Sequence, residues 1–149
     1  MNPRNFIQSS YDRNNSWAID IASNFFRNKG FQIIDSNEDY NIDFSIKNNL
    51  GYLFGIEVEV KTGYPFTSES DFPFDTVSFL GRKEKWKDLN FFYMIICKET
   101  KISVVCNSLY IFQEKFREKI YIDSYERKGY DTLYRVPKKD CLFINLSPN

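Results

Sequence analysis

The sequence predicts an α/β (α+β) domain in which helices flank a mixed β-sheet. One helical apolar stripe near the N-terminus is followed by short segments that alternate between polar and apolar residues or are wholly apolar. The expected order is a helix, three strands, a basic segment, two strands, a helix and a tail. With 149 residues, of which 42% are hydrophobic and 18% aromatic, the chain has the length and composition of one packed domain.

The first expected element is a helix from about Asp12 to Lys29. Trp17, Ile21 and Phe25 recur at every fourth position and form one buried stripe. Gly30 supplies the stop, because glycine readily takes the left-handed conformation found after helices.

Three strands are expected next, at Phe31–Asp35, Asn41–Lys47 and Tyr52–Thr62. The last two read as an antiparallel hairpin, because both alternate strictly and the residues between them, Asn48–Gly51, are typical of a turn. One face of the hairpin is apolar and predicted to pack into the core. The polar face carries Asp43 on the first strand and Glu57, Glu59 and Lys61 on the second.

The second half of the chain is less regular. The expected elements are a loop over Gly63–Asp75, an extended piece at Thr76–Leu80, a helix opening in the basic stretch Gly81–Lys87, a strand at Phe91–Cys97 buried on both faces, a strand at Ile102–Cys106, an amphipathic helix at Leu109–Ile120, and edge strands at Asp131–Val136 and Cys141–Leu146 that could pair. The single domain, 1–149, would have a core at about 12–120 and a C-terminal extension at 121–149.

The composition excludes several classes of protein. Lys plus Arg and Asp plus Glu both number 20, so bulk charge alone would not hold the chain on nucleic acid. Histidine is absent, which removes His-dependent triads and most zinc hydrolases. The three cysteines form no CxxC pair and read as reduced core residues of a cytoplasmic protein. We expect neither a signal peptide nor a membrane partner.

The hairpin predicts that carboxylates converge on its polar face. A turn centred between Asn49 and Leu50 would set Asp43 opposite Ile56, a polar residue against an apolar one. A bulge or a longer turn would move the partner of Asp43 to Glu57 or Glu59, and the residues alone leave both open. Carboxylates that gather without matching cations repel one another. A hard cation such as Mg²⁺ (or Mn²⁺) is the usual reason for such a cluster, since it prefers oxygen ligands.

Here the chain resembles the PD-(D/E)xK nuclease superfamily, and within it the branch of archaeal Holliday-junction resolvases. The resemblance rests on Gly30-Phe31 after the first helix, Asn41-Ile42-Asp43 on one strand and Glu59-Val60-Lys61 on the next, over roughly Asp12–Cys106. It implies a restriction-endonuclease-like core, with Asp43 and Glu59 as metal ligands and Asp43, Glu59 and Lys61 as catalytic residues. Asn41-Ile42 replaces the Pro that usually precedes the Asp, and Glu57 is an additional carboxylate that could itself be the ligand.

Further site residues follow from the same resemblance. Many relatives carry a Glu on the first helix, and Asp20 is the acidic residue well inside it, so it is carried over as a metal ligand. Relatives often place a basic residue after the Glu-x-Lys strand, near the scissile phosphate. The dense basic cluster of this chain therefore predicts phosphate contacts, with nucleic acid bound by Arg82, Lys83 and Lys85. Tyr64 and Phe66, in the loop after Lys61, could meet bases or sugars.

The resemblance implies a Mg²⁺-dependent endonuclease that hydrolyses phosphodiester bonds of DNA by metal-activated water, with branched or structured DNA among the expected substrates. A homodimer could present two sites to one substrate. One alternative is a catalytically inactive member of the same fold that acts as a nucleic-acid-binding or assembly module. Another is an interaction domain unrelated to nucleases. For Glu57, Glu59 and Lys61, the alternative to a functional site is a solvated strand face with cross-strand ion pairs.

Overall fold

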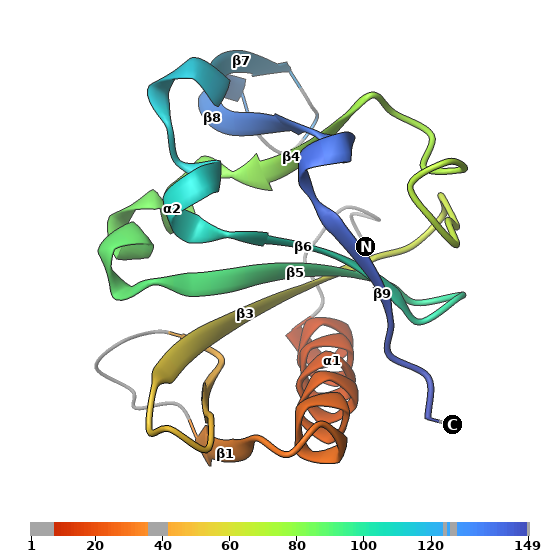
Figure 1. Ribbon diagram of the computed structural model, residues 1–149. Coiled ribbons are helices and arrows are strands. Elements are labelled where there is room, and N and C mark those ends of the chain that lie inside the picture. Colours follow the sequence, from red (N-terminus) through yellow and green to blue (C-terminus); the bar gives the residue numbers. More distant parts are fainter. Residues whose placement is uncertain (1–7, 36–41, 124, 126–127, 149) are drawn as a thin grey trace.

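The computed structural model describes residues 8–35, 42–123, 125 and 128–148. Two β-sheets and helices make up a mixed α/β fold. The larger sheet has six strands in the order β1-β2-β3-β5-β6-β9, and the smaller has three in the order β4-β8-β7. Figure 1 shows α1 below the larger sheet and the smaller sheet above it, so the large sheet is the middle layer. None of the helices in the described part of the chain is long and apolar enough to cross a membrane.

The N-terminal half follows the sequence prediction closely. The first helix begins four residues earlier than expected and ends at Asn28, before Gly30, whose φ of +93° is the conformation expected after a helix. The hairpin is antiparallel, and its second strand returns to the sheet beside a parallel neighbour, β5. The elements are α1 (Gln8–Asn28), β1 (Gln32–Asp35), β2 (Phe44–Lys47), β3 (Leu53–Lys61), β4 (Thr76–Leu80), the 3₁₀ helix η1 (Gly81–Leu89), β5 (Phe91–Cys97) and β6 (Ile102–Asn107).

The C-terminal half corrects two predictions. The expected helix at Leu109–Ile120 is wrong, because helix α2 stops at Ile111 and the chain then enters strand β7. The helical spacing of the apolar residues was misleading. In the second half of β7, half-buried and exposed side chains alternate, and Ile120 and Ile122 are the half-buried ones. The elements are α2 (Ser108–Ile111), the 3₁₀ helices η2 (Glu114–Phe116) and η3 (Lys138–Asp140), β7 (Arg117–Asp123), β8 (Lys128–Pro137) and β9 (Leu142–Asn145).

The pairing expected between the last two strands is also wrong. Strand β8 pairs with β4 and β7 in the smaller sheet, whereas β9 pairs with β6 at the edge of the larger sheet. Local alternation identifies a strand but does not identify its partner, so the two strands could be found in the sequence and not correctly joined.

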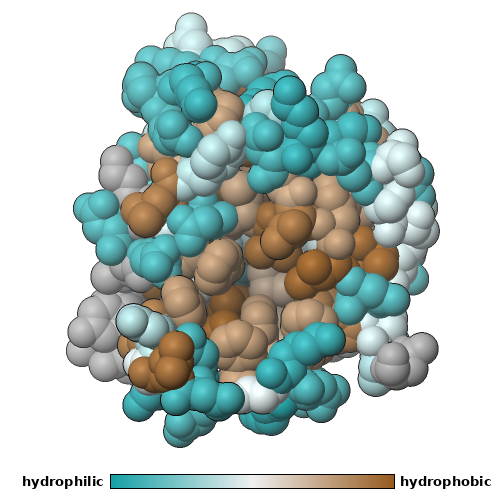
Figure 2. All heavy atoms as spheres, in the orientation of Figure 1, coloured by the Kyte–Doolittle hydropathy of each residue, from teal (hydrophilic) through white to brown (hydrophobic). Residues whose placement is uncertain are grey.

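Two apolar cores lie on opposite faces of the six-stranded sheet. Ala18 and Ala22 of α1 pack with Ile56 and Val58 of β3 in one core. The other core, which includes Tyr93, joins β5 and β6 to strands β4 and β8 of the smaller sheet. Both faces of β5 are therefore buried, as its apolar run predicts. Figure 2 shows apolar side chains over the middle of one side of the molecule and hydrophilic ones over the smaller sheet.

This layering corrects the view that the polar face of the hairpin is open to water. Glu57 is paired in register with Tyr93 of β5, on the side of the sheet that the smaller sheet covers. The side chain of Glu57 is only 1% exposed as a result. A solvated strand face does not describe this residue.

Candidate functional site

Asp43 and Glu57 meet where the hairpin begins. Phe44 pairs with Ile56, and the same register continued by one residue sets Asp43 opposite Glu57. The Val58 N–H donates to Oδ2 of Asp43 at 2.8 Å. This bond satisfies a backbone donor of β3 just before β2 begins at Phe44.

The turn of the hairpin accounts for this register. Asn48 N–H donates to the Tyr52 carbonyl oxygen at 3.0 Å, and the Asn48 side chain accepts from the N–H groups of Leu50 and Tyr52. Gly51 takes a φ of +87°, which a residue with a side chain rarely adopts. The turn is therefore longer than a two-residue turn, and Glu57 is the partner of Asp43 in place of Ile56.

The buried carboxylate of Glu57 is paired with Lys83. The Lys83 Nζ lies 2.7 Å from Oε2 of Glu57. The other oxygen, Oε1, is buried and forms no hydrogen bond of ordinary geometry within the described residues, although Asp43 lies close enough to interact with this carboxylate. A buried carboxylate oxygen without a partner is costly, and such atoms concentrate at functional sites.

Burial and mutual repulsion alter the acidity of the two carboxyls. Burial raises the pKa of Glu57 to about 7, the charge of Asp43 adds to the rise, and the charge of Lys83 opposes it. Burial also raises the pKa of Asp43, against the opposing hydrogen bond from Val58 and the charge of Lys83. Close to neutral pH the pair therefore holds a proton for part of the time, which is a frequent property of catalytic and metal-binding carboxyls.

Lys83 reaches Glu57 from helix η1, which follows β4 directly. Gly81 opens this helix against β8, and a Cβ atom added there would lie 2.5 Å from the Thr132 carbonyl oxygen. Only glycine permits this approach without a backbone shift. The close contact fixes the start of η1 against β8, and from there Lys83 reaches Glu57 of β3.

Glu59 has its own partners, two residues further along β3. The Tyr93 hydroxyl donates to Oε1 of Glu59 at 2.7 Å, and Lys61 Nζ lies 3.3 Å from Oε2. Burial, with the nearby charge of Glu59, raises the pKa of Tyr93, so this hydroxyl remains a donor. Lys61 is half-exposed, with 54% of its side chain accessible.

A pocket of about 160 Å³ lies beside these groups. Among the described residues, β3 has no strand partner on its β2 side beyond Ile56, so its edge faces this pocket. Glu59 and Tyr93 line one part of the pocket, and Arg82 and Lys83 bring positive charge to it. Its remaining walls are Asn14, Asn15, Val58, Val60 and Leu80.

Several predicted site residues do not line this pocket, among them Asp43, Glu57 and Lys61. Asp20 is exposed on α1 and lines a separate groove with Trp17 and Leu146, so the structure does not place it beside Asp43. The side chain of Lys85 lies outside the described residues. In the described part of the chain, no three His, Cys, Asp or Glu side chains are close enough together to form a metal site by themselves.

Sequence reasoning missed two features of this site. It did not assign a partner for Glu59, although Tyr93 lies in a strand predicted to be buried on both faces, where a hydroxyl needs an acceptor. It assigned Lys83 to phosphate, whereas in the structure Lys83 forms an ion pair with Glu57. A Phe66 contact with bases or sugars was also expected, but Phe66 is 2% exposed and belongs to the core.

The site thus combines a buried carboxylate pair, a lysine bonded to one of its members, and a pocket with further acidic and basic side chains. No family model, curated protein or solved structure matches this chain.

Proposed function

We propose that this protein is a metal-dependent nuclease that hydrolyses phosphodiester bonds of DNA, and that its larger sheet with α1 is a restriction-endonuclease-like core. The observation that carries the proposal is the juxtaposition of Asp43 with the 1% exposed Glu57, whose partner Lys83 lines the neighbouring pocket. Burying two carboxyls together costs several kcal/mol, so the arrangement is expected where function requires it. The helix, the antiparallel hairpin and the acidic residues of β3 follow the order that the resemblance implies.

The donor set fits a hard divalent cation. Asp43 and Glu57 offer carboxylate oxygens, which Mg²⁺ prefers, and among the described residues Oε1 of Glu57 is buried and accepts no hydrogen bond of ordinary geometry. These two residues would hold the ion, which supplies Lewis acidity and a more acidic water when bound. Compared with the pairing of Asp43 and Glu59 that the resemblance implies, the proposed ligand pair is moved by two residues along β3.

The remaining side chains would orient the substrate. Lys83 holds the Glu57 carboxylate in place, and Tyr93 does the same for Glu59. Lys61, which is half-exposed, would offset negative charge on the phosphoryl group. Arg82 lines the same pocket and would bind a flanking phosphate. In the reaction, the water oxygen bonds to phosphorus and loses a proton, the bond from phosphorus to the leaving sugar oxygen breaks, and that oxygen takes up a proton.

Cleavage assays test the proposal. Supercoiled, linear and branched DNA would be incubated with Mg²⁺ or Mn²⁺ and with the wild type, Lys61→Ala, Glu57→Gln or Asp43→Asn. We expect cleavage by the wild type and a loss of about 100-fold or more in each variant. Lys47→Ala, another exposed strand-end lysine, is the matched control for Lys61 and should cleave normally. Cleavage that persists in Lys61→Ala and Glu57→Gln would refute this mechanism.

One observation favours a second candidate function, a catalytically inactive nuclease fold that binds nucleic acid or assembles with partners. Lys83 and Lys61 already neutralise Glu57 and Glu59, at 2.7 and 3.3 Å, which is the role a cation would have. Under this alternative no DNA substrate is cleaved with either metal, while DNA binding survives the Glu57→Gln substitution. A homodimer and a branched substrate stay predictions of the resemblance.

A further inference from the structure

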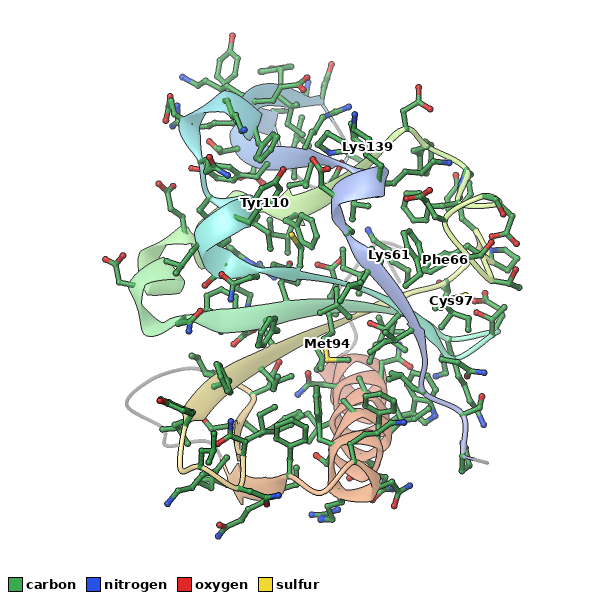
Figure 3. The ribbon with its side chains drawn as sticks, in the orientation of Figure 1. Lys61, Phe66, Met94, Cys97, Tyr110 and Lys139 are labelled. Carbon is green, nitrogen blue, oxygen red and sulfur yellow. The ribbon has the colours of Figure 1, made fainter. Side chains whose placement is uncertain are left out.

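The first pocket, which Glu59 lines together with Arg82 and Lys83, is called the carboxylate pocket here. A second pocket lies next to it, and the Glu59–Lys61 ion pair joins the two. Glu59 lines the first pocket and Lys61 lines the second, with 3.3 Å between their charged atoms. The second pocket measures about 260 Å³. Figure 3 shows Lys61 near Phe66, at the end of β3 from which the loop to β4 leaves.

Aromatic rings dominate the walls of this second pocket. Tyr64 and Phe74 are 65% and 54% exposed, and their ring centroids lie 5.9 Å apart. Behind them, the ring centroid of Phe72 lies 6.1 Å from that of Phe74 and 5.0 Å from that of the buried Phe66. A row of rings therefore runs from solvent into the core. Exposed aromatic surface of this kind is characteristic of binding sites.

The loop that carries the rings is held in place by hydrogen bonds. Asp71 accepts from the Thr67 hydroxyl and from the N–H groups of Ser68 and Thr67, bonds that also lower its pKa. The Thr100 hydroxyl donates to the Phe66 carbonyl oxygen at 2.7 Å, and Lys138 Nζ donates to that of Phe72 at 3.2 Å. The pocket is thus formed in advance, and a ligand would bind without first ordering the loop.

We propose that the second pocket binds one unpaired nucleobase while Lys61 contacts the attached phosphate. Because the rings of Tyr64 and Phe74 stand at 64° to one another, the base would stack on one ring and meet the other edge-on. The inference rests on the proposed function, and it deepens it by requiring a substrate with an unpaired base beside the scissile phosphate. A base offers an aromatic face to the rings and a negative phosphate to the lysine, and few other ligands offer both. Ser78 and Thr76 supply polar groups for the edge of the base.

Binding of two single-stranded probes tests this inference without cleavage. Fluorescence anisotropy in EDTA would compare a labelled thymidine oligonucleotide with an oligonucleotide of the same length whose sugars carry no bases. We expect the wild type to bind the base-bearing probe about 5-fold to 150-fold more tightly, the range for one stacked base. Tyr64→Ala combined with Phe74→Ala should abolish this preference.

Two further variants make the result specific. Tyr64→Leu combined with Phe74→Leu keeps apolar bulk without aromatic rings and should also lose the preference. Tyr130→Ala removes an exposed tyrosine of the smaller sheet, whose ring contacts Tyr121, and should retain it. Equal affinity of the wild type for both probes, or no binding of either, would overturn the inference, as would an undiminished preference in the Leu variant.

The outcomes separate this inference from the proposed nuclease function. Metal-dependent DNA cleavage by a protein that binds both probes with equal affinity would support the nuclease function and refute the base-binding pocket. A base preference that depends on Tyr64 and Phe74 in a protein that cleaves no DNA would support the pocket and refute the nuclease.

Discussion

Lys83 places its Nζ 2.7 Å from a carboxylate oxygen of Glu57, whose side chain is 1% exposed. The pair matters because Asp43, directly before strand β2, contributes a second negative charge to the same buried region. One lysine therefore neutralises part of the charge of two carboxyls, and the acidity of the site depends on it.

Replacing Lys83 by Met should destabilise the protein at pH 8. The change leaves Asp43 and Glu57 without their nearest cation, and we expect a loss of about 2 kcal/mol, reduced from the value for a fully buried pair because Lys83 is 21% exposed. At pH 5 the loss should be smaller, since Glu57 is then protonated. Urea unfolding at the two pH values measures both losses. Lys128→Met, which breaks an exposed ion pair with Asp123, should change stability by less than 1 kcal/mol.

The raised pKa of Glu57 predicts how stability depends on pH. The pKa is about 7 in the folded protein and about 4.5 ordinarily, so the folded state binds this proton more tightly. The contribution of Glu57 to stability is then fully present below pH 4.5 and lost as the pH rises to about 7. In EDTA, the wild type should lose on the order of 3 kcal/mol relative to Glu57→Gln across this window. A stability difference between the two proteins that stays constant with pH would contradict the prediction.

Tyr93→Phe should reduce DNA cleavage by more than its small cost in stability would explain, because it removes the donor that orients Glu59. The substitution removes one buried hydroxyl and leaves the Glu59 carboxylate without its 2.7 Å donor, at a cost of about 1–2 kcal/mol. DNA cleavage should fall by about 10-fold or more, because Glu59 and the paired Lys61 lose a fixed orientation. Tyr134→Phe, a buried tyrosine that does not line the carboxylate pocket, is the control and should keep full activity. Equal cleavage activity of the Tyr93→Phe and Tyr134→Phe variants would show that the orientation of Glu59 does not contribute to cleavage.

The parts of the fold that could be read from the sequence are those with a local cause. The stripe of Trp17, Ile21 and Phe25 requires a helix, and the alternation before and after the Asn48 turn requires a hairpin. Asp43, Glu57, Glu59 and Lys61 could be named for the same reason. The register could not be obtained, because it depends on the hydrogen bonds of the Asn48 side chain within the turn.

The burial of Glu57 could not be predicted because its cause is distant in the sequence. The polar face of the hairpin is covered by a sheet whose strands include β8, some seventy residues later. No pattern within the hairpin sequence indicates that the smaller sheet covers its polar face. The partner of Lys83 is hidden for the same reason, since it depends on the contact of Gly81 with Thr132.

Site-specific Mn²⁺ binding tests the central claim, that Asp43 and Glu57 together hold a divalent cation. Titration calorimetry at pH 7.5 would compare the wild type with Asp43→Asn and Glu57→Gln. Asp20→Asn is the matched control, since this carboxylate lies in a separate groove. We predict one Mn²⁺ site in the wild type and in Asp20→Asn, weakened at least 10-fold in both of the other variants. Wild-type affinity for Mn²⁺ in Glu57→Gln would contradict the account.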